Sequence, residues 1–316
     1  MNEKMCSFFF LVSAAVNIQP SSNPAAAGDN VTLSVTPEVT MGDGNWVFGS
    51  SPILTWLGSD VAVFGSYQGR ASVNVVTGAL TLTSVTLADS GTYKVQSDDP
   101  PLTASTFITV LEPISNVKVE KNQTDQTEFD SSVVMKCSVS SGFSPSFRWL
   151  NDSSEVTAND RVRLTDRNTT LTIFNLTRYD DGPFMCFVFN AVSNSTSRPV
   201  KVNTIYGPDN MAVAVNGTLL LGSNVTALCS AQSNPPAHLH WTYEGEAVNQ
   251  TSGPLLEVYG LTEEQSGSYT CVAFNNITRL NNNITAHITI RSESIQKTVH
   301  VWLVPLLLLI MLTVHV

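Results

Sequence analysis

Residues 86–95 read TLADSGTYKV, and the spacing of their Asp, Gly and Tyr is typical of one strand of a β-sandwich. In one class of β-sandwich, an Asp, a Gly and a Tyr with the spacing of Asp89, Gly91 and Tyr93 lead to a cysteine two residues after the tyrosine. Val95 stands at that position here. The stretch therefore predicts a sandwich strand that keeps the frame of a disulfide-linked strand but lacks its cysteine.

The same frame recurs twice along the chain with its cysteines in place. DDGPFMC ends at Cys186 and QSGSYTC ends at Cys271. Two earlier strands with alternating inward and outward residues, DSSVVMKC and GSNVTALC, end at Cys137 and Cys229. A tryptophan follows each of these two cysteines by twelve residues. Cys–Trp–Cys at this spacing among short strands is the immunoglobulin sandwich pattern, so we expect disulfides Cys137–Cys186 and Cys229–Cys271.

The first repeat has valine at both cysteine positions. GDNVTLSV (28–35) matches the first-cysteine strand but ends in Val35, and Trp46 follows eleven residues later. Two valines can pack where the bridge would lie, and burial of each side chain stabilises by about 1.5–3 kcal/mol. We therefore expect a sandwich that is held together by packing alone.

This first sandwich also has a longer stretch of chain between its two cysteine-equivalent positions than the other two sandwiches. Sixty residues separate Val35 from Val95, against 49 and 42 for the cysteine pairs. The extra length favours additional strands on one sheet, as in the variable type, with an inserted strand at PILTWLG (52–58). Arg70 and Asp89 stand where variable-type domains place an ion pair.

Composition excludes several classes of function. The net charge is −10, with no basic stripe, so nucleic acid is not an expected partner. No nucleophile elbow, phosphate-binding loop or set of metal ligands is visible, so we expect no enzymatic activity, no metal and no cofactor. Charged residues make up only 13% of the chain, about half the usual share, so another source of surface hydrophilicity is needed.

Eleven Asn-x-Ser/Thr acceptors supply that hydrophilicity if they are glycosylated, and their density favours the secretory route. Asn175 is expected within a strand. The acceptors are Asn30, Asn122, Asn151, Asn168, Asn175, Asn194, Asn216, Asn224, Asn249, Asn276 and Asn283.

Both ends of the chain read as targeting segments. Residues 1–15 have a short apolar run and small residues before Ala15, which is typical of a signal peptide that is removed together with Cys6. Residues 292–316 contain small residues, a short polar stretch and a terminal apolar run. This tail fits a glycolipid-anchor signal with attachment at Ser292, or alternatively a single transmembrane helix.

The fold class is therefore all-β, with three tandem immunoglobulin-like sandwiches. The expected segments are a signal peptide (1–15), a variable-like domain without a disulfide (16–111), two constant-type domains (112–204 and 205–291) and a membrane-attachment segment (292–316).

The chain as a whole resembles the carcinoembryonic-antigen-related cell adhesion molecules. The likeness rests on GDNVTLSV…DSGTYKV without cysteines, RNTTLTIFNLTRYDDGPFMC in the second domain and EEQSGSYTCVAFNN in the third. Residues 69–95 look particularly like such proteins from fishes. The resemblance implies a glycoprotein on the outer face of the plasma membrane that mediates cell–cell adhesion.

In that family the front sheet of the first domain is the adhesive surface, which implies a partner-binding face here. By alternation Trp46, Tyr93 and Val95 point inward, so Val47, Lys94 and Gln96 should face outward. We expect Leu54 and Trp56, or their neighbours in the strand, to join them. The partners would be the same chain or other immunoglobulin-like surface proteins. The alternative is a ligand-binding or decoy receptor of the immune system that acts through other membrane partners.

Overall fold

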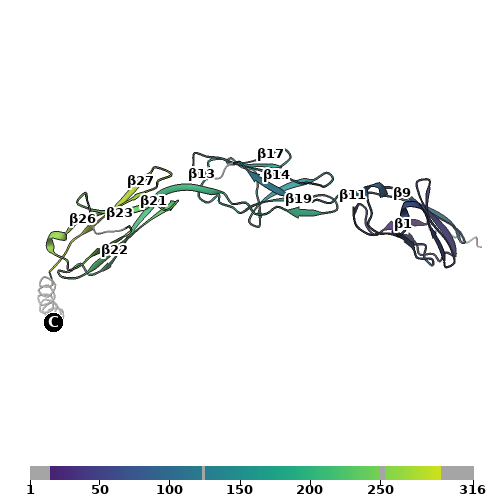
Figure 1. Cartoon of the computed structure of the whole chain (residues 1–316), viewed down its shortest axis with the longest axis horizontal. Helices are drawn as coiled ribbons and strands as arrows, with labels where there is room; N and C mark the ends of the chain where they lie inside the picture. Colours follow the sequence, from purple (N-terminus) through teal and green to yellow (C-terminus); the bar gives the residue numbers. More distant parts are fainter. Residues whose placement is uncertain (1–14, 123–124, 249–252, 293–316) are drawn as a thin grey trace, which may run out of the picture. The chain divides into compact units, whose positions relative to one another are not determined.

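The computed structural model describes residues 15–122, 125–248 and 253–292 (Figure 1). The expected signal peptide up to residue 14, Asn249 and the tail beyond Ser292 lie outside the described residues. Strands make up the regular structure of the described part, with three short 3-10 helices at Gly65–Tyr67, Leu87–Asp89 and Glu263–Gln265. No helix among the described residues is long and apolar enough to cross a membrane. The all-β class with several immunoglobulin-like sandwiches is confirmed.

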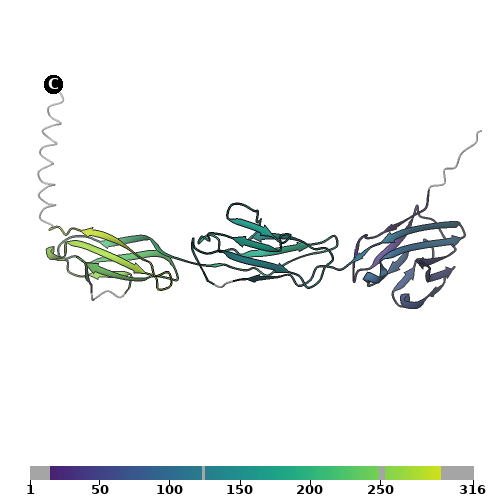
Figure 2. The same cartoon turned by 90° about the horizontal axis from the view of Figure 1, so that it is seen from above.

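The N-terminal sandwich contains two main sheets (Figure 2). One has the order β1 (Asn17–Pro20), β3 (Val31–Thr36), β8 (Leu80–Leu82) and β7 (Ala71–Val73). The other has the order β10 (Pro101–Ile108), β9 (Gly91–Asp98), β4 (Asp43–Phe48), β5 (Ser51–Leu57) and β6 (Asp60–Val63). A small parallel pair joins β2 (Ala25–Ala26) to β11 (Val110–Leu111).

Apolar packing fills the place of a disulfide in this sandwich. Val35 and Val95 are buried in one core cluster with Trp46. Val95 lies opposite Trp46 in the register of β4 and β9. Cys186 likewise lies opposite Trp149, and the third sandwich repeats the pairing. The two valines therefore occupy the disulfide positions, as the sequence predicts.

Arg70 and Asp89 form the expected ion pair. The guanidinium donates from Nη1 to Oδ2 at 2.9 Å and from Nη2 to Oδ1 at 2.6 Å. Thr86 also donates to this carboxylate through its backbone N–H, at 2.7 Å. Burial raises the pKa of Asp89, but the hydrogen bonds from Arg70 and Thr86 outweigh it and hold the pKa below its usual value. The carboxylate thus links Arg70, which precedes β7, to Thr86, which precedes the 3-10 helix Leu87–Asp89.

In two of the repeats a buried tyrosine hydroxyl bonds the backbone carbonyl four residues earlier, an arrangement called a tyrosine corner. The Tyr93 hydroxyl donates to the carbonyl of Asp89 at 2.8 Å, and the Tyr269 hydroxyl donates to the carbonyl of Gln265 at 3.1 Å. Phe184, at the equivalent position of the middle repeat, is buried and has no hydroxyl.

Two further sandwich regions follow in the chain. The middle region has two sheets. One has the order β12 (Lys118–Lys121), β14 (Val133–Ser138), β18 (Thr170–Ile173) and β17 (Val162–Thr165). The other has the order β16 (Ser154–Glu155), β15 (Ser146–Asn151), β19 (Phe184–Phe189) and β20 (Asn194–Thr196). The C-terminal region also has two sheets. One has the order β13 (Asp125–Thr127), β21 (Asn203–Gly217), β22 (Val225–Asn234) and β25 (Leu255–Val258). The other has the order β24 (Glu246–Ala247), β23 (His238–Tyr243), β26 (Gly267–Phe274) and β27 (Asn281–Ile288).

Both expected disulfides are present in these later regions. Cys137 bonds Cys186 and Cys229 bonds Cys271, with Cα atoms 6.2 and 6.4 Å apart. Contacts between Cα atoms divide the chain into two compact units. One contains the described residues up to Glu120, Met135–Leu171 and Pro183–Val200; the other contains Lys121–Val134, Thr172–Gly182 and the described residues from Lys201 on. The domain boundaries expected from the sequence stay predictions.

An arginine cluster lies inside the second unit. Arg178 donates from Nη2 to Glu128 at 2.7 Å and also bonds both carboxylate oxygens of Asp209. Its guanidinium lies 4.0 Å from the centre of the Tyr206 ring. The hydrogen bonds from Arg178 lower the pKa of both carboxyl groups. This cluster links residues from three segments of the unit that are far apart in the sequence, so no local pattern predicts it.

The strand expectations hold with one difference. The inserted strand is present as β5, and β6 adds a further strand at the edge of the same sheet. Asn175 does not lie within a strand, because β18 ends at Ile173 and Asn175 occupies a bend with φ of 49°. Asparagine tolerates this left-handed conformation better than most residues.

Asp89→Asn should lower the free energy of unfolding of the N-terminal sandwich by about 1–3 kcal/mol. The value lies below that for a fully buried pair because the Arg70 side chain is 23% exposed. Urea unfolding will measure the loss. Glu155→Gln is the matched control, since the Arg148–Glu155 pair is exposed and 3.8 Å apart, and it should cost less than about 0.5 kcal/mol. Equal effects of the two substitutions would contradict the assignment.

The same carboxylate predicts a pH dependence. Because its pKa is lowered by folding, its stabilisation is complete above the unfolded pKa, about 3.9, and is lost as pH falls through the folded value. The stabilities of the wild type and of Asp89→Asn should therefore converge in acid.

The double substitution Val35→Cys, Val95→Cys should form a disulfide in an oxidising environment. In the chain-entropy model, closing this loop stabilises by about 4 kcal/mol, less any strain. A mass loss of about two hydrogens and a higher unfolding midpoint would show it. The single variant Val35→Cys is the control and should gain no stability. A double variant with two free thiols would show that the valines do not stand in for the bridge.

Candidate binding face of the N-terminal sandwich

The outer face of the sheet β10-β9-β4-β5-β6 brings the expected contact residues together. Val47 lies opposite Lys94 and Asn45 lies opposite Gln96 in the register of β4 and β9. All four side chains are half-buried. Cross-strand neighbours of this kind have Cβ atoms about 4.5–5.5 Å apart, so they form one continuous patch.

The outward placement expected for Leu54 and Trp56 is wrong. Leu54 is fully buried and Trp56 is 3% exposed. A register shift follows the pair Trp46–Leu54, so that Leu54 shares the inward side of Trp46. The next pair joins Val47 to Pro52, which leaves Ile53 as the extra residue of a bulge.

Their neighbours face outward instead. Thr55 lies opposite Asn45, and Leu57 is 72% exposed at the end of β5. The corrected patch therefore contains Asn45, Val47, Thr55, Lys94 and Gln96. We call these five residues the front patch.

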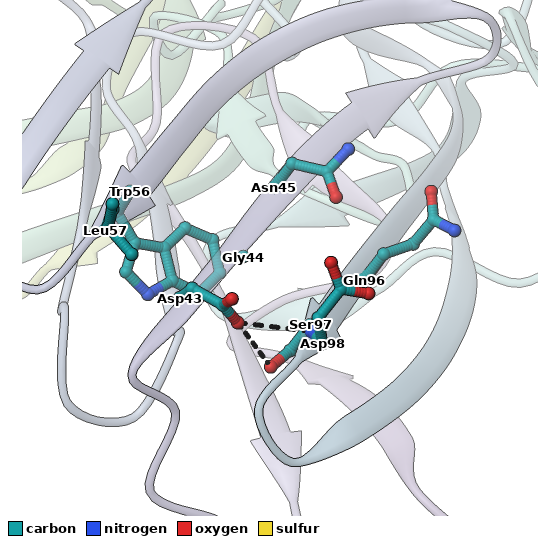
Figure 3. A pocket seen from close by; sticks show the side chains of 8 residues that line it. All are labelled: Asp43, Gly44, Asn45, Trp56, Leu57, Gln96, Ser97 and Asp98. Carbon is teal, nitrogen blue, oxygen red and sulfur yellow. Dashed lines mark hydrogen bonds between the residues drawn. The ribbon is translucent and has the colours of Figure 1, made fainter.

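A pocket of about 440 Å³ lies at the end of this sheet where β4 begins and both β5 and β9 end (Figure 3). It is lined by Asp43, Gly44, Asn45, Trp56, Leu57, Gln96, Ser97 and Asp98.

Asp43 fixes the turn beside the pocket. Its Oδ1 accepts hydrogen bonds from the backbone N–H groups of Asp98 and Asp99, each at 3.1 Å, and from the Ser97 hydroxyl at 3.2 Å. The bonds from Asp99 and Asp98 lower the pKa of Asp43. The carboxylate is therefore ionised at neutral pH and makes this end of the sheet acidic together with Asp98.

Trp56 forms the inner wall of the pocket. Its Nε1–H is buried and has no hydrogen-bond partner within the described part of the chain. A buried donor without an acceptor is costly, so a water or a ligand oxygen is expected to meet it. Indole N–H, carboxylate and amide groups together suit a ligand that carries hydroxyl groups, or a hydroxyl- or amine-bearing side chain of a partner.

Only glycine fits at position 44. A Cβ on Gly44 would contact the Trp56 ring and lie 2.7 Å from the carbonyl oxygen of Gln96. The absence of a side chain lets the Trp56 indole lie close to the backbone of β4, where it lines the pocket. Sequence reasoning missed the pocket, because its residues come from three strand ends.

Gly44→Ala should destabilise the N-terminal sandwich by about 1–3 kcal/mol, because the added methyl group overpacks the site. Gly42→Ala is the control, since a Cβ there meets no atom nearer than 3.9 Å. Thermal unfolding of the two variants will separate them. A Gly44→Ala protein as stable as Gly42→Ala would show that Trp56 moves freely.

The chain is similar to several known proteins. Residues 116–190 and 213–275 match the family described as Immunoglobulin domain. The cell adhesion molecule CEACAM16 of Rattus norvegicus is 26% identical over 291 residues, which cover 84% of this chain and 67% of that protein. Nothing in these comparisons supports the expected likeness to fish proteins.

Two solved structures show the same fold. The full ectodomain of mouse nectin-like molecule 4 (Ig1–Ig3) matches with a TM-score of 0.63 and 17% identity, over 86% of this chain and 97% of that one. A complex of the mouse coronavirus receptor-binding domain with its murine receptor matches with a TM-score of 0.52 and 24% identity, over 60% of this chain and 100% of that one. The chain belongs to the immunoglobulin superfamily and is a distant relative of the carcinoembryonic-antigen-related cell adhesion molecules.

Proposed function

We propose that this protein is a cell-surface glycoprotein that mediates adhesion or recognition between cells through the front patch of its N-terminal sandwich. The observation behind the proposal is the distribution of glycosylation acceptors. None lies in residues 43–63 or 91–108, which form the five-stranded sheet. Asn30, the acceptor in this sandwich, immediately precedes β3 in the other sheet. The front patch thus contains no acceptor for an N-linked sugar.

The composition of the front patch suits a contact surface. Asn45 lies at its centre, opposite Gln96 on one side and Thr55 on the other, and the apolar Val47 lies beside it on β4, opposite Lys94. Interfaces commonly combine apolar area with polar groups, and this patch offers both. The relationship to cell adhesion molecules supports this role, and no enzymatic role is proposed.

Attachment to the outer face of the plasma membrane is part of the proposal. It rests on the apolar sequence of residues 292–316 and the expected signal peptide at 1–15, and a glycolipid anchor at Ser292 or a transmembrane helix would serve equally. The ten acceptor asparagines in the described residues are all exposed, which fits a glycosylated ectodomain.

The pocket beside Trp56 favours a second candidate function. The buried indole N–H, which has no acceptor among the described residues, and the Asp43 carboxylate that also lines the pocket provide a donor and an acceptor for a ligand. A receptor that binds a soluble ligand or a partner side chain at this end of the sheet would use both groups.

Val47→Asp and Lys94→Glu should each abolish aggregation of beads coated with the full chain. Each substitution places negative charge in the front patch, and buried like charges oppose association. Ser72→Asp is the matched control, since Ser72 is an exposed residue of β7 in the opposite sheet, and it should aggregate like the wild type. Unchanged clustering by both front-patch variants would refute this face as the adhesive surface. Binding to another protein without bead aggregation would favour the receptor function.

A further inference from the structure

The exposed side of the middle sheet β16-β15-β19-β20 contains an aromatic platform. Phe187 and Phe189 alternate with buried residues along β19, and both rings are half-buried. Their centroids are 5.7 Å apart and the ring planes differ by 26°, so the rings are stacked. The guanidinium carbon of Arg148 lies 5.0 Å from the centre of the Phe189 ring. We call Arg148, Phe187 and Phe189 the aromatic platform.

A glycosylation acceptor lies directly beside this platform. Asn194 is opposite Phe189 and Thr196 is opposite Phe187 in the register of β19 and β20. Side chains of directly opposite residues project from the same side of a sheet, with Cβ atoms about 4.5–5.5 Å apart. Both residues that the acceptor motif requires therefore stand on the same side as the rings. Asn194 is exposed, so its Nδ2 is accessible.

There is room for a sugar at this place. A depression of about 390 Å³ is lined by the aromatic platform and by residues 190–194 of the connecting turn. It is larger than one pyranose ring and is open on the outer side. One of its walls is the residue to which the sugar would be attached.

We propose that Asn194 is glycosylated and that the first N-acetylglucosamine of its glycan packs against the aromatic platform. In the secretory pathway the donor is a lipid pyrophosphate oligosaccharide. The bond between sugar C1 and the pyrophosphate oxygen breaks, a bond from C1 to Nδ2 forms, and the proton lost from Nδ2 goes to the leaving pyrophosphate or its surroundings.

The C–H bonds of the sugar then meet the faces of the rings. This contact removes apolar ring surface from water and brings the slightly positive C–H groups against the weakly negative ring faces. The sugar acts as a fixed cover for a surface that otherwise remains exposed, and it joins β20, an edge strand, to β19. The glycan thereby stabilises the hairpin. The proposal does not depend on adhesion through the N-terminal sandwich.

Asn151 offers a matched comparison within the same sheet. It is also an exposed acceptor, but it lies opposite Phe184, whose ring is 3% exposed. No exposed ring is paired with it. A glycan at Asn151 gains no comparable contact.

The test uses the full chain produced in a eukaryotic secretory host. Mass spectrometry first determines whether Asn194 is occupied. Hydrogen exchange then measures the protection of the backbone N–H groups of β19 and β20. Asn194→Gln should accelerate this exchange by roughly 2- to 10-fold, whereas Asn151→Gln and Thr196→Ser, which preserves the Asn194 acceptor, should leave it unchanged.

The platform itself is tested with Phe189→Leu, which retains apolar volume without an aromatic ring. In this background Asn194→Gln should have little further effect. NMR of the wild-type glycoprotein provides a measurement without any substitution, because ring currents should shift protons of the first N-acetylglucosamine at Asn194 upfield. An unoccupied Asn194, unshifted sugar protons, or an equal effect of Asn194→Gln with and without Phe189 would each overturn the proposal.

Discussion

A buried tryptophan in each sandwich needs an acceptor for its indole N–H, and the remaining arrangement depends on that need. Each of three indoles donates to a carbonyl just before a strand of the opposite sheet: Trp46 to Gly78 at 2.8 Å, Trp149 to Asn168 at 2.8 Å and Trp241 to Pro254 at 3.0 Å. An unpaired buried N–H is costly, so this bond favours the arrangement in which the two sheets face each other at the tryptophan. The disulfide then adds a covalent link to a geometry that already exists, which explains why two valines can replace it.

The inward position of Trp46 also determines what lies outside. Alternation along β4 and β9 makes Val47, Lys94 and Gln96 the outer neighbours of Trp46 and Val95. These three residues could be placed from the sequence because their strands contain the strongest markers of the fold. The same reasoning identified the disulfides and the Arg70–Asp89 pair, which depend on residues at fixed spacing within one sandwich repeat.

Reasoning from the sequence failed where the structure departs from simple alternation. The bulge in β5 cannot be read from PILTWLG, and it turned Leu54 and Trp56 inward. The pocket also lay beyond prediction, because it depends on three strand ends that meet only in the folded sheet. Trp56 is the exception to the tryptophan rule, since its N–H has no acceptor within the described residues. This exception lies at a pocket, where a bound oxygen can take the place of a backbone carbonyl.

The outer faces of the middle sheet β16-β15-β19-β20 and of the N-terminal five-stranded sheet differ in what can cover them. Only 13% of the residues are charged, so charge repulsion contributes little to preventing contact between such faces on different molecules. On the middle sheet, an acceptor asparagine stands opposite the stacked rings, so a sugar of the chain itself can cover them. On the N-terminal five-stranded sheet no acceptor is present, and the apolar area around Val47 stays open to another molecule. The two sheet faces thus differ in whether they contain an Asn-x-Ser/Thr acceptor. The face with an acceptor can be covered by the chain's own sugar, and the face without one is left for a partner.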